Sequence, residues 1–277
     1  MRRYLFLFML CSLFLSCEKN EVPDEVLYEK LAEFNHELTV TVCGCGCDEP
    51  IDEFTWRKEL EWDYPVKPGM EEWKEFQSTQ EMIDACQIPD NILSSLSTEN
   101  LTDICLQYPL IINVFVFDNM NVGLDAFFDE FNGIRELYKR KEVSKELLKR
   151  YYEMMQNVSF LCSAAPDKGN FMIPVSALEV LIKSTIRNND AINNYKTLLK
   201  YLVFGYETKL KYTSYFGYGF QTNYYARAHL IIKISPKSIK KFPNGDNNPI
   251  FICDFSSGEA MNETLSVIDE LSYQLIE

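Results

Sequence analysis

Three cysteines at alternate positions form the most unusual cluster of reactive side chains in the sequence. Cys43, Cys45 and Cys47 are separated by single glycines, and alternate residues of an extended chain face the same side. With His36 seven residues upstream, the three thiols could hold a soft ion such as Zn²⁺ or Cu⁺. The spacing differs from the C-x2-C pairs of zinc ribbons, so we expect no metal and no cofactor. A disulfide to a distant cysteine such as Cys86 is a further alternative.

A cysteine hydrolase would require a thiol within hydrogen-bond reach of an imidazole. The sequence contains two histidines, His36 and His229. His229 stands beside Leu230 and Ile231 in a segment typical of a strand, which favours a structural role. Cys253 lies in a second such segment, so a Cys253–His229 pair is the candidate dyad. No Gly-x-Ser-x-Gly, phosphate-loop or His-Glu-x-x-His motif occurs, and we therefore predict no catalytic residue.

Aromatic residues crowd the segment 201–225. Tyrosine rings can stack on sugars or peptide groups while the hydroxyl stays hydrated, so the candidate ligand is a peptide or a glycan. The alternative is that the rings cover the join between helices and a neighbouring β element. The candidate ligand-binding residues are Tyr212, Tyr215, Tyr218, Tyr224 and Tyr225.

The elements that must position these residues are mainly helical. Ser78-Thr79-Gln80-Glu81 is a capping-box pattern, and Ser97 precedes a second helical pattern. The apolar run 110–117 could be a buried strand or a buried helix, and its helical neighbours favour a helix. Further helical periodicity covers residues 124–131, 143–151, 174–186, 191–211 and 261–276.

Two segments near the C-terminus are typical of strands, Ala228–Ile234 and Pro249–Phe255. The predicted fold class is therefore mainly α, an irregular multi-helix array with a small β element near the C-terminus. The cap signals are unevenly spaced, so no tetratricopeptide-like repeat is indicated.

The composition is that of a globular, acidic chain. Hydrophobic residues make up 47% of the 277 residues and charged residues 25%, which argues against wholesale disorder. Lysine and arginine number 27 against 41 acidic residues, for a net charge of −14. Because phosphate binding draws its energy mainly from basic residues, we expect no nucleic-acid partner.

The N-terminal residues predict export from the cytoplasm. Arg2 and Arg3 precede an apolar run over residues 4–15. That run is too short to cross a bilayer, which takes about 20 residues, and it fits a secretion signal instead.

The sequence Phe14-Leu15-Ser16-Cys17 resembles the lipobox of bacterial lipoproteins, in the loose form of Bacteroidetes-type members. The resemblance implies cleavage before Cys17, acylation of this cysteine and attachment to the membrane through its acyl chains, which exceed the two signals that stable anchoring needs. The expected location is the bacterial cell envelope, at the outer membrane. The alternative is an ordinary signal peptide with an incidental cysteine.

Seven cysteines would then remain in the mature chain, and an odd number cannot all pair within one molecule. Three of them lie in apolar segments with helical spacing and are expected to be small buried hydrophobes: Cys86, Cys105 and Cys162.

Two further stretches resemble secreted Bacteroidetes-type proteins. Residues 45–58, with Cys45-Gly46, Pro50 and Trp56, are similar to a short motif of small secreted lipoproteins, although Arg57 replaces an apolar residue. Five further stretches occur in a fixed order: Ile88-Pro89, Ser97-Thr98-Glu99-Asn100-Leu101, Cys105-Leu106-Gln107-Tyr108-Pro109, Phe131-Asn132-Gly133 and Leu137-Tyr138-Lys139-Arg140-Lys141. Together they resemble an uncharacterised helical domain, over about residues 78–155, that precedes a papain-like hydrolase module in some relatives. The Asn-Cys-His stretch of that module is absent here.

These observations predict an envelope-anchored lipoprotein that binds or scaffolds a partner without catalysis. The alternatives are a small cysteine hydrolase and a degenerate remnant of a helical-plus-hydrolase protein. The predicted organisation is a signal peptide over 1–16, a lipidated tether and lead-in segment over 17–77, a helical domain over 78–211 and a small α/β part over 212–277.

Overall fold

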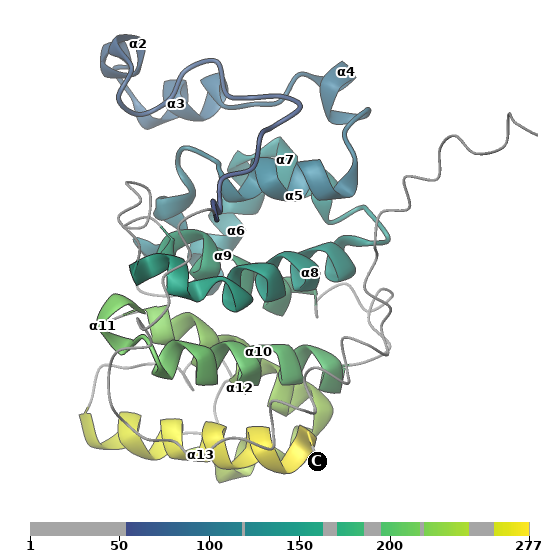
Figure 1. Ribbon diagram of the computed structural model, residues 1–277, viewed down its shortest axis with the longest axis vertical. Helices are drawn as coiled ribbons and strands as arrows, with labels where there is room; N and C mark the ends of the chain where they lie inside the picture. Colours follow the sequence, from purple (N-terminus) through teal and green to yellow (C-terminus); the bar gives the residue numbers. More distant parts are fainter. Residues whose placement is uncertain are drawn as a thin grey trace, which may run out of the picture. The chain divides into compact units, whose positions relative to one another are not determined.

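The computed structural model describes residues 54–117, 120–162, 171–185, 195–216, 219–243 and 258–276 (Figure 1). All of them belong to one unit of the chain, Val42–Glu277. Most of the described residues lie in helices, and no strand occurs among them. The prediction of a mainly α fold is confirmed.

The first part of the described chain consists mainly of short helices, two of which, α3 and α5, begin at the predicted serine caps. The Ser78 hydroxyl accepts a hydrogen bond from the Glu81 amide at 3.2 Å, and the Ser97 hydroxyl accepts one from the Asn100 amide at 3.1 Å. Each bond satisfies an amide that the helix itself leaves unpaired. The elements are α2 (Glu71–Glu75), α3 (Thr79–Ala85), α4 (Asp90–Leu93), α5 (Thr98–Leu106), the 3-10 helix η1 (Ile111–Phe115), α6 (Met120–Glu130) and α7 (Asn132–Leu137).

Longer helices follow and pack side by side. Helix α12 lies against α9, α10 and α13, and α8 lies against α5, α9 and α10 (Figure 1). Every residue of the stretch 174–185 in and after α9 is buried, so α9 has no solvent face there. The elements are α8 (Val143–Gln156), η2 (Val158–Cys162), α9 (Met172–Ser184), α10 (Tyr195–Leu210), α11 (Thr213–Phe216), α12 (Gly219–Ile234), η5 (Pro236–Lys241) and α13 (Gly258–Ile276).

The predicted strand Ala228–Ile234 is wrong, because these residues form the second half of α12. Helix α12 is covered by three neighbours, so its polar and apolar positions are buried alike and no helical period is visible in the sequence. Its isoleucines favour a strand by local propensity, and the packing overrides that preference. The second predicted strand, Pro249–Phe255, lies outside the described residues. The helix predicted over 261–276 is confirmed as α13.

Residues 54–64, here called the N-terminal segment, pack against α5 and α8 although they contain no helix. Trp56 and Tyr64 are both buried, and the Tyr64 hydroxyl donates a hydrogen bond of 2.8 Å to the Ile104 carbonyl in α5. Tyr64 also meets the stacked rings of Tyr108 and Phe131, whose centroids are 4.3 Å apart. The core of the described chain therefore includes residues well before position 78.

No helix in the part of the chain that the structure describes combines the length and the hydropathy required to cross a membrane.

Candidate functional site

A fully buried carboxylate, Glu179 of α9, lies at the centre of a buried polar cluster. Its Oε1 atom accepts hydrogen bonds from the Tyr151 hydroxyl at 2.6 Å and from the Asn223 amide at 2.9 Å. Its Oε2 atom accepts from Lys209 Nζ at 2.7 Å and from the Thr222 hydroxyl at 2.5 Å. We call these five residues the Glu179 network. It links four helices, α8, α9, α10 and α12.

The geometry of the Glu179 network is that of a structural ion pair. A carboxylate offers about four acceptor positions, and the four donors account for all of them, which leaves no lone pair to take a proton from a substrate. Burial lowers the pKa of the Lys209 ammonium, and the Glu179 carboxylate opposes that shift. Lys209 Nζ also donates to the Gly219 carbonyl at 2.8 Å. This ammonium is therefore used to hold α10 against α9 and α12.

A close backbone approach completes the Glu179 network. A Cβ atom on Gly205 of α10 would lie 1.8 Å from the Tyr151 hydroxyl oxygen, well inside van der Waals contact. Glycine at this position lets α10 approach α8 closely enough for the Tyr151 hydroxyl to reach Glu179.

A second buried cation, Arg227 of α12, joins the C-terminal helix α13 to the rest. Its guanidinium donates to Asp269 Oδ1 at 2.8 Å and to the Ser272 hydroxyl at 3.2 Å. It also lies over the rings of Tyr206 and Tyr224, at 4.2 and 4.8 Å from their centroids. Arg227 is completely buried, so both its charge and its planar surface serve helix packing.

The predicted ligand-binding tyrosines fall into two environments. Tyr224 is buried, and its hydroxyl lies 2.7 Å from that of Tyr206. Tyr225 is also buried, and its hydroxyl receives a 2.9 Å hydrogen bond from Lys183 Nζ. Tyr215 is exposed and Tyr212 is half-buried, whereas Tyr218 lies outside the described residues. The structure therefore does not bring the five tyrosines to one surface.

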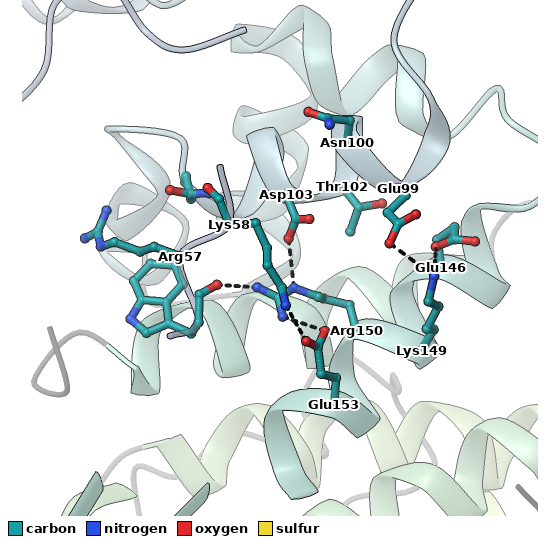
Figure 2. A network of polar contacts seen from close by, with 12 residues as sticks. Arg57, Lys58, Glu99, Asn100, Thr102, Asp103, Glu146, Lys149, Arg150 and Glu153 are labelled. Atoms are coloured by element: carbon teal, nitrogen blue, oxygen red, sulfur yellow. Dashed lines mark hydrogen bonds and ion pairs between the residues drawn. The ribbon is translucent and has the colours of Figure 1, made fainter. Parts of the chain in front are cut away.

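The N-terminal segment is attached to α8 by charged groups (Figure 2). Arg150 is buried and donates to Asp103 Oδ1 and to Glu153 Oε2, both at 2.8 Å, and also to the Trp56 carbonyl. Lys58 Nζ donates to Glu153 Oε1 at 2.5 Å. Trp56 and Lys58 belong to the lipoprotein-like motif, so in this chain that motif supplies contacts that hold residues 54–64 on α5 and α8.

The two carboxyl groups that bind Arg150 have pKa shifts in opposite directions. Burial raises the pKa of the Asp103 carboxyl, and Arg150 opposes the shift without cancelling it. Burial also acts to raise the pKa of Glu153, but Lys58 and Arg150 outweigh it and the net shift is downward. At the surface side of the same view, Lys149 lies 3.2 Å from Glu99 and 3.7 Å from Glu146 (Figure 2).

The cysteine predictions are confirmed in two positions and wrong in a third. Cys86 and Cys105 are free and buried, as expected of small hydrophobes. Cys162 is disulfide-bonded and only partly buried. Its apolar neighbours in η2 are typical of a core residue, and they give no sequence signal for disulfide pairing, which depends on a cysteine elsewhere in the chain. Cys17, the Cys43–Cys47 cluster and Cys253 lie outside the described residues.

His229 is half-buried on α12 and bonds within its own helix. Its Nδ1 atom lies 2.9 Å from the Tyr225 carbonyl oxygen, so the tautomer with a proton on Nδ1 donates there. This agrees with the structural interpretation of His229. The other histidine, His36, lies outside the described residues. Within the described ranges, no three side chains of the metal-ligating types gather closely enough to hold an ion.

An exposed apolar patch is the feature that sequence reasoning missed. Four large apolar side chains within eleven residues are strongly exposed: Ile112 (46%), Val116 (73%), Phe117 (42%) and Val122 (51%). We call these four residues the apolar patch. The run 110–117 was expected to be wholly buried, because an uninterrupted apolar sequence is typical of core. The residue types of the run give no signal for this exposure, because Ile112 is exposed whereas the neighbouring Ile111 is buried.

The comparisons with known proteins give no relative. No protein-family model matches the chain, and no curated protein and no solved structure is significantly similar to it.

Proposed function

We propose that the mature chain is a lipid-anchored protein of a bacterial cell envelope, held by acyl chains on Cys17. Its helical domain acts by binding or scaffolding a partner and not by catalysis. The positive leader, the short apolar run and Ser16-Cys17 support the anchor. A chain with two or more acyl groups stays on a membrane without a spanning helix.

The disulfide at Cys162 is the structural observation that carries the location. Disulfide bonds form and persist in oxidising compartments such as the periplasm and the cell surface, and they are rare in the cytosol. Cys162 is disulfide-bonded, which is the state expected of an exported chain.

The state of the two free thiols among the described residues, Cys86 and Cys105, supports a non-catalytic role. A cysteine nucleophile acts as the thiolate and requires a lowered pKa and access to solvent. Burial instead raises the pKa of Cys86 to about 11 and also raises the pKa of Cys105. Both thiols are therefore protonated at neutral pH and shielded from a substrate.

The proposal predicts that Cys17→Ala moves the protein from the membrane fraction to the soluble fraction. The substitution should also abolish the incorporation of radiolabelled palmitate, because the acylated side chain is gone. Cys11→Ala is the matched control, since Cys11 lies within the leader and should change neither result. Membrane association that survives Cys17→Ala would refute the lipid anchor.

A further inference from the structure

The apolar patch is a local concentration of exposed hydrophobic surface. Ile112 lies in η1 and Val122 in α6, whereas Val116 and Phe117 directly follow η1. The two helices contact each other. Apolar side chains exposed singly are common on protein surfaces, whereas the largest apolar patch of a protein is often part of an interaction site.

The patch is held in place by close packing beneath it. Leu110, Ile111 and Val114 are buried on the other side of η1. A Cβ atom on Gly123 would lie 2.1 Å from the Val114 carbonyl oxygen, so α6 and η1 touch through their backbones. Asn121 of α6 is buried and accepts a 2.5 Å hydrogen bond from Lys183 of α9. The exposed side chains are therefore presented on a rigid support.

The surroundings of the patch are acidic. Residues 110–130 contain four acidic residues and no lysine, arginine or histidine. Asp125 and Asp129 are exposed on α6, three and seven positions after Val122, so the three residues share one helical face. Arg135, the nearest cation along the chain, donates to the Phe128 and Asp129 carbonyls at the far end of α6.

Charge argues against a second copy of this chain as the occupant, because the like charges of two acidic segments would oppose each other. A bilayer is a poor match as well, since membrane-binding surfaces carry lysine and arginine beside their apolar residues.

We propose that the apolar patch docks a basic amphipathic segment of another protein. Apolar side chains of the partner cover Ile112, Val116, Phe117 and Val122, and its lysines or arginines face the carboxylates of α6. This inference deepens the binding role proposed above and is independent of the acylation of Cys17.

The test uses the mature chain, Cys17–Glu277, with Cys17→Ser so that no acyl chain contributes. The probe is a fluorescent 18-residue helical peptide with a leucine face and a lysine face, and its counterpart carries glutamate in place of lysine. Fluorescence anisotropy should show at least tenfold tighter binding of the lysine peptide. The binding should weaken with added salt, because charge attraction contributes to it.

Two single substitutions separate the patch from general charge attraction. Val116→Ser and Val122→Ser keep every charge, and each should weaken binding of the lysine peptide at least threefold. Leu210→Ser is the matched control, because Leu210 is an exposed apolar residue on α10, and it should bind as the parent does. The two variants are independent, so one that fails to fold leaves the other as the test.

Three results would overturn the inference. Equal binding of the lysine peptide by the parent and by both patch variants would assign the attraction to net charge. Self-association in sedimentation that both variants abolish would make the patch an interface between copies. Co-sedimentation with phosphatidylcholine vesicles that both variants abolish would make it a membrane surface. The binding assay uses a chain without acyl groups. Its failure would therefore count against the docking site alone and not against the lipid anchor, which the Cys17→Ala experiment tests.

Discussion

Two regions of the molecule differ in which residue types they bury. The interior formed by α9, α10 and α12 buries charged side chains, whereas the η1–α6 segment exposes apolar ones. The interior contains three fully buried charged residues, Glu179, Lys209 and Arg227. The η1–α6 segment instead exposes the four residues of the apolar patch. The comparison teaches that residue type alone does not decide burial in this chain; the partner available to each group does.

The interior tolerates charge because its charged groups have partners with good geometry. Glu179 accepts from four donors in the Glu179 network, and Arg227 has both Asp269 and two aromatic rings. Desolvation of an ion is offset when charge and hydrogen bonds are satisfied together. The residues of the apolar patch stay at the surface, because the backbone contact at Gly123 holds η1 against α6 and fixes which face of the segment is buried.

The strongest way to break the interior half of this comparison is Glu179→Ala. The substitution leaves the Lys209 ammonium buried without its counter-ion and removes the acceptor of three other donors. Loss of one partner of a buried ion pair costs about 3–5 kcal/mol, so urea unfolding should show a decrease of that size in the free energy of unfolding.

The matched control is the double variant Glu179→Met with Lys209→Met, which removes both charges and keeps similar volumes. It should recover the part of the loss that comes from the unpaired Lys209 charge, since apolar replacement of a whole buried pair is often neutral. A smaller loss should remain, because Tyr151, Asn223 and Thr222 still lack their acceptor. A single variant within about 1 kcal/mol of the parent would contradict the assigned role of Glu179.

Gly123→Ala breaks the surface half of the comparison. The new Cβ would meet the Val114 carbonyl oxygen at 2.1 Å and must push α6 away from η1. We expect a loss of about 1–3 kcal/mol in the free energy of unfolding, typical of overpacking, together with weaker binding of the lysine peptide. Val122→Ala, one residue away and exposed, should change stability by no more than about 0.5 kcal/mol. A fully stable Gly123→Ala protein would show that the contact is not rigid.

Glu153→Gln sharpens the comparison at the boundary between interior and surface. The Lys58 and Arg150 charges hold the pKa of Glu153 below its ordinary value although burial opposes them. Its ionised form therefore stabilises the fold above the unfolded pKa of about 4.3, and this contribution is lost as pH falls through the lower folded pKa.

Because the Lys58–Glu153 pair is more than one-third exposed, its loss should cost no more than about 1 kcal/mol at neutral pH. Urea unfolding at about pH 7 should distinguish parent and Glu153→Gln, and unfolding at about pH 2.5 should not. Glu71→Gln is the control, since the Glu71–Lys74 pair is far more exposed and should contribute nothing measurable. A difference between parent and Glu153→Gln that grows as pH falls would reverse the sign and refute the argument.

Local sequence signals predicted the helical elements well. Ser78 and Ser97 cap helices as expected because an N-cap bond is made within three residues. The helix at 261–276 was visible because only one of its faces is buried, which preserves a helical period. Helix α12 was partly mistaken for a strand because burial on several sides removes that period.

The Glu179 network and the burial of the tyrosines were less predictable from the sequence than the helices were. Nothing near Glu179 in the sequence marks it as a partner of Lys209, since the two residues are 30 positions apart and meet only when α9 and α10 pack. The tyrosine cluster at 212–225 was visible as composition, but the packing of α12 directs Tyr224 and Tyr225 inward. The disulfide of Cys162 likewise depends on a contact that its own neighbours do not encode.

By itself the sequence determined what depends on neighbours along the chain: the helix caps at Ser78 and Ser97 and the acidic character. The export leader and the lipid anchor at Cys17 stay proposals that rest on the same kind of local pattern. The tertiary structure alone decided which charged groups are buried, because ion pairs such as Arg150–Asp103 and Lys209–Glu179 join separate helices. It also decided that Val116 and Val122 are exposed. An apolar side chain is buried only where another element covers it, and the close contact of η1 with α6 uses the opposite face of that segment.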